Sequence, residues 1–382
     1  MIYLPRVAEQ LTREYLQAFP VVGIAGPRQS GKSTMLKHMF SDEYQYVTFD
    51  DFQVRQLFYD DPVRFMRMHP GKVIFDEVQY IPELFPQIKM AVDDDRDQYG
   101  RFILTGSGQF LLGKYVSESL AGRIGLIPLL PFQFSEIPQQ RQPESIYKGG
   151  YPELVTREYT HSDLWYRAYI ETYLQKDLRQ LMNITDLHAF GLFIRSLAVT
   201  VGQTLNLSSM SRDIGVAVNT LRRWLSVLEA SYLIFSLHPY HVNLGKRMIK
   251  SPKVYFYDTG LLDSFLGIAT QIDWEKSLMY GPVFENYIIS EVLKAKFHSG
   301  NPFAIHFIRT SHGDEIDLVM ESGSDATYIE IKASYTYKPH FHNGLTKLLP
   351  PGSKGYVIYQ GESIQLDSTL QAVNYRRFLL SI

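Results

Sequence analysis

The stretch GPRQSGKS at residues 26–33 constrains the fold of this chain more than any other part of it. An apolar segment with the character of a buried strand, residues 21–25, precedes it, and a helical pattern at residues 34–40 follows it. The pattern G-x-x-x-x-G-K-[ST] between a strand and a helix is that of a phosphate-binding loop, because its backbone N–H groups converge on a phosphate at the positive end of the helix. We therefore expect a nucleoside triphosphate to bind here.

The residue types within this loop each have a chemical reason. The Lys32 side chain would neutralise the β- and γ-phosphate oxygens, and the Ser33 hydroxyl would hold Mg²⁺. The residues expected to surround the nucleotide are Gly26, Gln29, Ser30, Gly31, Lys32, Ser33 and Thr34.

Residues 72–77, KVIFDE, form an apolar strand pattern that ends in two acids, as in a Walker B motif. At the carboxyl end of such a strand Asp76 would reach the Mg²⁺ through water. Glu77 would polarise the water that attacks the γ-phosphate. The acid pair therefore predicts hydrolysis in addition to binding.

A third apolar strand pattern, residues 102–104, runs into Thr105, Gly106 and Ser107. If this strand is inserted between the other two, its hydroxyls lie beside the γ-phosphate, which is a sensor-like position. The alternative is a polar strand end whose hydroxyls cap the chain.

Arg123 follows these strands in the segment LAGR. It could contact the γ-phosphate of its own chain, or that of a neighbour in a homo-oligomer, and stabilise the transition state. A solvated or ion-paired arginine is the alternative.

Length and composition limit the number of domains and the classes of function that are possible for this chain. The chain has 382 residues, of which 45% are hydrophobic, and is long enough for two or three domains. Its net charge of −2 offers no overall attraction for nucleic acid, so such a contact would need local basic patches. The absence of cysteine excludes disulfides, thiolate zinc sites and cysteine nucleophiles. The longest apolar run, residues 124–132, is too short to cross a bilayer, so we expect a cytoplasmic protein without membrane contact.

The chain divides into three stretches, residues 1–140, 141–245 and 246–382. In the first, strands alternate with amphipathic helices, which predicts an α/β fold with a parallel sheet between two helical layers. The second is helical. The third has a helix at residues 283–297 and a series of strands. The strands expected in the third stretch are residues 253–257, 303–309, 315–320, 327–333 and 355–359.

Taken in order, the motifs GPRQSGKST, YVTFDD, VIFDEVQ, FILTGSGQFLL, SESLAGRI and GGYPELV resemble those of prokaryotic AAA-type ATPases with a C-terminal DUF4143 domain. The resemblance covers nearly the whole chain. It implies an AAA-like α/β core that hydrolyses ATP with Mg²⁺, and it says little about the purpose of that hydrolysis. By this resemblance Lys32 and Ser33 bind the nucleotide, and Asp76 and Glu77 form the Walker B motif. Ser107 is then the sensor residue, and Arg123 is the arginine finger.

Residues 207–230 predict a helix-turn-helix. The first helix is serine-capped and ends at Gly215, and the second spans residues 219–229, with a wing-like strand at residues 232–240 to follow. This winged-helix-like segment would expose Arg222 and Arg223 to double-stranded DNA; a packing or protein-docking role is the alternative. The side chains expected to form its buried stripe are Leu221, Trp224, Leu225 and Leu228.

The last stretch carries a second candidate site. Asp317 lies in an expected strand, and after a turn Glu330 and Lys332 share one face of the next strand. With Glu285 on the preceding helix, they resemble the D-(x)n-E-x-K core of restriction-endonuclease-like nucleases. Asp317 and Glu330 would bind Mg²⁺ there, and Lys332 would orient water or stabilise developing charge. Alternating charge on a solvated strand is the competing interpretation.

These features leave two functions open. In the first, ATP hydrolysis drives or switches a C-terminal α/β module that binds nucleic acid, with or without cleaving it. In the second, the protein is a nucleotide-dependent interaction switch, and its helix-turn-helix and nuclease-like modules are inactive scaffolds. A nucleotide kinase is disfavoured, because no acceptor pocket or lid arginines are visible.

Overall fold

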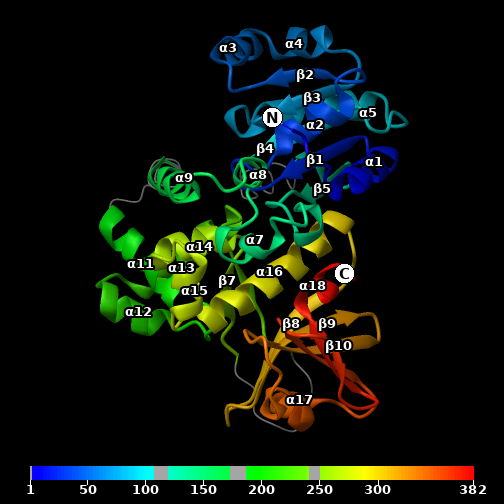
Figure 1. The fold of residues 1–382 in the computed structure, drawn as a ribbon. Coiled ribbons are helices and arrows are strands. Elements are labelled where there is room, and N and C mark those ends of the chain that lie inside the picture. The colour runs from blue at the N-terminus through cyan, green and yellow to red at the C-terminus, as the bar shows by residue number, and fades with distance from the viewer. Residues whose placement is uncertain (1, 107–118, 173–185, 241–249) are drawn as a thin grey trace.

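The computed structural model describes residues 2–106, 119–172, 186–240 and 250–382. Figure 1 shows a parallel sheet with its helices in blue and cyan, a group of green helices, and a second sheet in orange and red at the opposite end. The yellow helix α16 (Tyr280–Ser299) lies between the two sheets. Within the described ranges no helix has the length and apolar character needed to cross a membrane.

The N-terminal part is built on five parallel strands in the order β2-β3-β4-β1-β5. Helices lie on both faces, so the predicted three-layer α/β arrangement is confirmed. Its strands are β1 (Val21–Ala25), β2 (Gln45–Thr48), β3 (Val73–Asp76), β4 (Phe102–Gly106) and β5 (Ile124–Pro128). Its helices are α1 (Ala8–Ala18), α2 (Lys32–Phe40), α3 (Phe52–Asp60), α4 (Pro62–Met68), the short η1 (Val78–Tyr80) and α5 (Leu84–Asp94).

Alternate residues of each strand point to opposite faces of this sheet and meet different helices. On one face Val22 packs in a cluster with Leu36 of α2. On the other face Val21 belongs to a larger cluster with Phe58 of α3 and Phe85 of α5. Because both faces are covered, β1, β3 and β4 are buried along their whole length, and their sequences are continuous apolar runs.

The middle part is helical, as predicted. Asn206, rather than a serine, caps α12 by accepting a hydrogen bond from Ser209 N at 3.0 Å, and the helix ends at Gly215 with φ 78°. Its elements are η3 (Phe134–Glu136), α7 (Gln142–Lys148), α8 (Pro152–Thr156), α9 (Ser162–Tyr169), α11 (Leu187–Val199), α12 (Leu207–Ile214) and α13 (Val218–Ala230). They are followed by β6 (Ile234–Leu237), β7 (Lys253–Phe256), α14 (Thr259–Leu266) and α15 (Gln271–Lys276). The buried residues of α13 are the predicted Leu221, Trp224, Leu225 and Leu228.

The strand expected at residues 253–257 does not belong to the C-terminal sheet. It is β7, and it pairs antiparallel with β6 in a separate two-stranded sheet. The predicted boundary at residue 245 therefore falls between two strands that form one hairpin beside α13. An apolar strand carries no local sign of which partner it takes, so only the tertiary structure decides this pairing.

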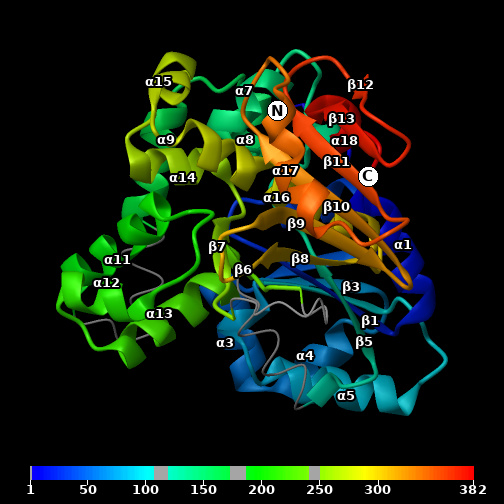
Figure 2. The ribbon, with the colours of Figure 1, turned by 90° about the horizontal axis from the view of Figure 1, so that it is seen from below.

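The C-terminal part is a mixed sheet of six strands in the order β12-β13-β11-β10-β9-β8. Strands β8, β9 and β10 form an antiparallel meander, and β11 lies parallel to β10. In Figure 2 this sheet faces the viewer together with α17. Its strands are β8 (Ala304–Arg309), β9 (Glu315–Ser322), β10 (Asp325–Lys332), β11 (Lys354–Tyr359), β12 (Ile364–Gln365) and β13 (Leu370–Asn374). Its helices are α16, η5 (Pro339–His342), α17 (Asn343–Leu348) and α18 (Tyr375–Leu379).

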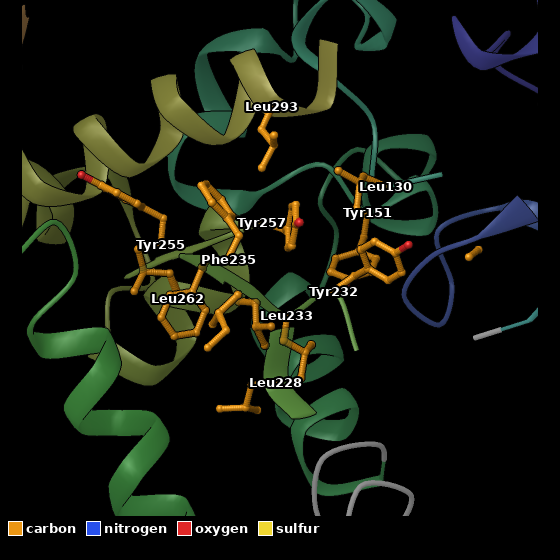
Figure 3. Packing of buried hydrophobic residues seen from close by; sticks show 14 of the residues in the cluster. Leu130, Tyr151, Leu228, Tyr232, Leu233, Phe235, Tyr255, Tyr257, Leu262 and Leu293 are labelled. Carbon is orange, nitrogen blue, oxygen red and sulfur yellow. The ribbon is translucent and has the colours of Figure 1, made fainter. Parts of the chain in front are cut away.

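One apolar core joins the three parts. It contains Leu130 after β5, Leu228 of α13 and Leu293 of α16, which Figure 3 shows in one cluster. Helix α16 packs on α1 and β5 on one side and on β10 on the other. The two sheets are therefore held on a single buried helix.

Candidate functional site

Three strands of the parallel sheet end at one place. β4 lies between β1 and β3, with Thr105 beside Ile24 and Leu104 beside Phe75. Because these strands are parallel, their carboxyl ends share one edge of the sheet, where α/β folds bind ligands. The loop after β1, the acids at the end of β3 and Thr105 at the end of β4 are therefore neighbours. Strand β4 is inserted between β1 and β3, which is the arrangement that the sensor-like position requires.

Two glycines give the loop its shape. A Cβ on Gly26 would lie 2.1 Å from the carbonyl oxygen of Leu129, so a side chain does not fit there. Gly31 has φ 92°, which a residue with a side chain rarely adopts, and α2 starts directly after it. Gln29 is exposed with φ 62°, whereas Ser30 is buried beneath the loop.

The Lys32 side chain folds back onto the loop. Its ammonium group donates hydrogen bonds to the carbonyl oxygens of Gly26 at 3.2 Å and Pro27 at 2.9 Å. Lys32 is only 5% exposed, and burial lowers its pKa to about 8, although the negative charges of Glu77 and Asp76 oppose the shift. A buried ammonium at this position favours a ligand that brings negative charge.

Asp76 is the centre of a group of hydroxyls at the end of β3. Ser33 Oγ lies 3.1 and 3.0 Å from its two carboxylate oxygens, and the hydroxyls of Tyr46 and Thr105 also donate to Asp76. Oxygen ligands of this kind suit Mg²⁺. The predicted Mg²⁺ ligands Ser33 and Asp76 therefore lie side by side and fit this ion. Tyr46 lies on β2 within the motif YVTFDD, but sequence reasoning gave this tyrosine no role beside Asp76.

Glu77 leaves the strand with a left-handed backbone, φ 59° and ψ 44°. For a residue other than glycine this conformation costs on the order of 1–3 kcal/mol, and such strain is frequent at functional sites. The Glu77 side chain is half-buried and accepts a hydrogen bond from Gln79, while its backbone N–H points to Thr105 Oγ1 at 3.4 Å. Ser107, the predicted sensor, lies outside the described residues.

Arg123 lies at the other edge of the sheet. It directly precedes β5, and Ile124 pairs with Val21 at the start of β1, whereas the phosphate loop follows the end of β1. The Arg123 guanidinium donates to Asp93 Oδ1 at 2.9 and 2.7 Å. The expectation that Arg123 contacts the nucleotide of its own chain is therefore corrected, because the whole length of β1 separates the two. A contact with a neighbouring chain stays a prediction.

A cavity of about 300 Å³ opens beside the loop. It lies between the N-terminal segment, the start of α2 and α8. Much of its wall is apolar or aromatic, in contrast to the polar groups at the loop itself. The residues that line it include Tyr3, Leu4, Gln29, Thr34, Phe132 and Pro152.

Arg6 holds the phosphate loop from beneath, which no sequence motif indicated. Its guanidinium donates to the carbonyl oxygen of Ser30 at 2.8 Å, to that of Leu130 at 2.7 Å and to Glu136 at 3.1 Å. It also lies 4.7 Å from the ring centre of Phe132. The Arg6 and Glu136 side chains are each 2% exposed. Burial alone would raise the pKa of Glu136, but Arg6 and the other partners of this carboxylate together lower it.

Side chains of α16 hold the same segment from the other side. Glu291 accepts a hydrogen bond from Phe134 N at 2.5 Å. It also forms an ion pair with Lys294 at 2.7 Å. The His298 ring accepts from Leu130 N at 3.1 Å through Nε2, and burial lowers its pKa to about 3, so it is neutral. These three polar side chains of α16 are buried. Residues 130–136 are thus fixed between Arg6 and the C-terminal half of α16.

The four residues of the second candidate site also meet. The antiparallel register of β9 and β10 pairs Ile329 with Leu318, so Asp317 lies opposite Glu330. Lys332 Nζ lies 2.9 Å from Glu330 and 3.5 Å from Asp317. Burial and the charge of Asp317 raise the pKa of Glu330 to about 8, and burial raises that of Glu285. Both shifts disfavour the charged carboxylates, and the ion pairs with Lys253 and Lys332 oppose them.

Lys253 of β7 joins these acids, a contact that no sequence pattern indicated. Its ammonium group lies 3.1 Å from Glu285 Oε1 and forms a second ion pair with Glu315. Burial alone would lower the pKa of Lys253, but Glu285 and its other acidic neighbours raise it well above its usual value. In the described part of the chain, no group of three His, Cys, Asp or Glu side chains could hold a metal ion.

Helix α13 presents polar side chains to solvent on the face opposite its buried stripe. Asn219, Arg222, Arg223 and Ser226 are exposed there, and Arg222 donates to Asn219 at 2.8 Å. The predicted exposure of both arginines is confirmed.

Comparison with protein families agrees with these observations. Residues 18–138 match the model of an AAA domain, residues 139–272 the domain of unknown function DUF8612, and residues 280–378 the domain of unknown function DUF4143. An uncharacterized protein of Mycobacterium tuberculosis is 32% identical over 338 residues, which cover 88% of this chain and 75% of that protein. The chain belongs to this family of uncharacterized prokaryotic P-loop ATPases.

Relatives of this family occur in other organisms. An uncharacterized protein of Haemophilus influenzae is 22% identical over 81% of each chain. Among solved structures, the Walker-type ATPase PABY2304 of Pyrococcus abyssi has a TM-score of 0.48 at 16% identity, and the match covers 68% of this chain and 94% of that one. A score of this size carries no functional conclusion. The N-terminal part is an AAA-type ATPase domain, as its family model describes.

The lowered pKa of Lys32 predicts how nucleotide affinity depends on pH. Above pH 8 the empty site loses the Lys32 proton, so binding of a triphosphate must take a proton up again. We expect the Kd for ATP to rise by up to about tenfold per pH unit between pH 8 and 9.5. Calorimetric titration of the parent protein with a non-hydrolysable ATP analogue measures this, because it leaves the charge of Glu77 beside Lys32 unchanged. A Lys72→Gln change at an exposed lysine should keep the slope, and a flat Kd across that range would contradict the assignment.

Proposed function

We propose that this protein binds ATP with Mg²⁺ and hydrolyses it. We also propose that Arg6 and α16 couple the occupancy of the nucleotide site to the conformation of the C-terminal part. The observation that carries the proposal is the meeting of Lys32, Ser33, Asp76 and Glu77 at one sheet edge. Within the AAA domain, these are the residue types that phosphoryl transfer requires.

The chain's own residues have separate tasks in this proposal. Lys32 exchanges its two loop carbonyls for phosphate oxygens, and the loop N–H groups together with the α2 amino end stabilise negative charge. Ser33 and Asp76 would hold the Mg²⁺, which supplies further charge stabilisation when it is bound. Glu77 takes a proton from the attacking water, and its negative charge acts on Lys32 of the loop.

The cavity beside the loop supports a place for the nucleobase. It starts at Gln29 and Thr34 of the phosphate site, and Tyr3, Phe132 and Pro152 give it apolar and aromatic walls. Nucleotide sites combine an apolar pocket with a few polar groups. Because Pro152 belongs to α8, a base bound in this cavity would contact the middle part as well as the AAA domain.

The Walker B assignment is tested by Glu77→Gln. We expect kcat for ATP hydrolysis to fall by about 10²- to 10³-fold with little change in the Kd for ATP, because the amide keeps the size but cannot accept the proton. A steady-state assay with a parallel binding titration measures both quantities. The matched control is Glu83→Gln at an exposed glutamate, which should hydrolyse ATP at the parent rate. A Glu77→Gln protein as fast as the parent would disprove the assignment.

Transmission through Arg6 is tested by hydrogen exchange. ATP binding should slow amide exchange in residues 130–136 and in the C-terminal half of α16 of the parent, because Arg6 bonds both to the loop and to that segment. In Arg6→Ala we expect slowing at the loop alone and a Kd for ATP about tenfold higher.

Arg13→Ala, at an exposed arginine of α1, is the control and should resemble the parent. The Arg6→Lys protein keeps the charge but not the forked geometry, so its coupling should be intermediate. Equal slowing of α16 in the parent and in Arg6→Ala would contradict the transmission.

Double-stranded DNA is a second element of the proposal, supported by the exposed arginines of α13. If α13 lies on DNA, duplex DNA should stimulate the ATPase, and Arg222→Ala with Arg223→Ala should lower duplex affinity by about tenfold or more. Fluorescence anisotropy and the ATPase assay measure these effects at a fixed salt concentration. The control is Arg212→Ala on α12, which should bind as the parent does. A parent ATPase that ignores duplex DNA would favour the interaction-switch alternative.

A further inference from the structure

The carboxylate cluster consists of Glu285, Glu315, Asp317 and Glu330, which come from α16, β9 and β10. The resemblance to restriction-endonuclease-like nucleases implies a Mg²⁺ ion bound by Asp317 and Glu330, two members of this cluster. Whether a metal fits depends on what already occupies the space between the carboxylates.

Lys253 enters this cluster from outside the C-terminal sheet. It is the first residue of β7, which pairs with β6 of the middle part. Its side chain is 1% exposed, and its ammonium group bonds Glu285 Oε1 at 3.1 Å and pairs with Glu315. The ring of Phe307 lies 5.4 Å from the same ammonium group. The site around this ammonium group is therefore built from two carboxylates and an aromatic face.

The carboxylate oxygens near Lys253 are already engaged. Glu285 Oε1 accepts a second hydrogen bond, from the Tyr255 hydroxyl, at 2.6 Å. Arg309 pairs with the other oxygen of Glu315 at 2.9 Å. Mg²⁺ requires close, nearly octahedral oxygen coordination, and it gives up its water reluctantly. It would have to displace these donors.

The remaining two acids have their own cation. Lys332 pairs with Glu330 and with Asp317, and Asp317 Oδ2 also accepts from Ile331 N at 2.8 Å. All four carboxylates therefore have a cationic partner from the protein. A divalent ion placed beside Glu285 and Glu315 would meet the positive charge of Lys253 at close range.

We propose that Lys253 takes the position of the cation in the carboxylate cluster, so that this cluster binds no divalent metal and joins the middle part to the C-terminal sheet. The ion pairs of Lys253 connect β7 with α16 and β9. The C-terminal module is then not a metal-dependent nuclease.

The test converts the cluster into a metal site by removing the lysine. Full-length protein with Asp76→Asn, which disables the nucleotide-site ligand, is titrated with Mn²⁺ while Tm and bound Mn²⁺ by electron paramagnetic resonance are recorded. We expect the carboxylate cluster to bind no Mn²⁺ in the Asp76→Asn protein. When Lys253→Met is added, we expect the protein to gain one bound Mn²⁺, and its Tm to rise by about 4 °C or more on binding. The added change Asp317→Asn should abolish the gain.

Lys250→Met, at an exposed lysine close in sequence, is the matched control and should gain nothing. Because Lys253→Met leaves buried acids without a cation, Lys253→Met with Glu315→Gln is the second variant and removes one charge of each sign. No gain of Mn²⁺ in a folded Lys253 variant would overturn the proposal. Binding of Mn²⁺ by the Asp76→Asn protein that is lost when Asp317→Asn is added would also overturn it. The same holds for Mg²⁺-dependent DNA nicking by the parent protein that Lys332→Ala abolishes. Since ATP takes no part in these readouts, they do not depend on the ATPase proposal.

Discussion

The buried Arg6 guanidinium is the constraint on which the arrangement of this molecule depends. An arginine keeps its charge at any physiological pH, so its burial requires acceptors on every side. Two segments supply them: the phosphate loop at Ser30, and the chain after β5 at Leu130 and Glu136. Removing one partner of a buried pair of this kind costs about 3–5 kcal/mol, because it leaves a charge without compensation. The phosphate loop is therefore tied to the chain that leaves the AAA domain.

Helix α16 extends that constraint through the molecule. Its C-terminal half holds the segment after β5 through Glu291 and His298, and its first turns carry Glu285 into the carboxylate cluster. Glu285 and His298 are thirteen residues apart, which is about 20 Å along a helix. Polar contacts at both ends of one buried helix join the nucleotide site to the C-terminal sheet. Such a continuous series of contacts is what a nucleotide-dependent switch requires, and three domains that move independently would lack it.

Much of the nucleotide site was predictable from sequence, because its signals are local. The loop backbone requires Gly26 and Gly31, and Asp76 ends the apolar strand β3, as its pattern predicted. The insertion of β4 between β1 and β3, which the sequence left open, came from the structure. Helical spacing likewise identified the buried stripe of α13, and period-two alternation placed Glu330 and Lys332 on one face of β10. In each case spacing along one or two elements fixes which side chains share a face.

The sequence by itself determined the strand, loop and helix of the phosphate site, the acids of β3 and the general order of the three parts. Only the tertiary structure decided which charged residues meet. Arg6 reaches Glu136, Lys253 reaches Glu285, and Arg123 pairs with Asp93 away from the nucleotide site. A charged residue carries no local pattern that names its partner. The partner depends on which distant elements pack together, and that is set by the burial of apolar surface across the whole chain.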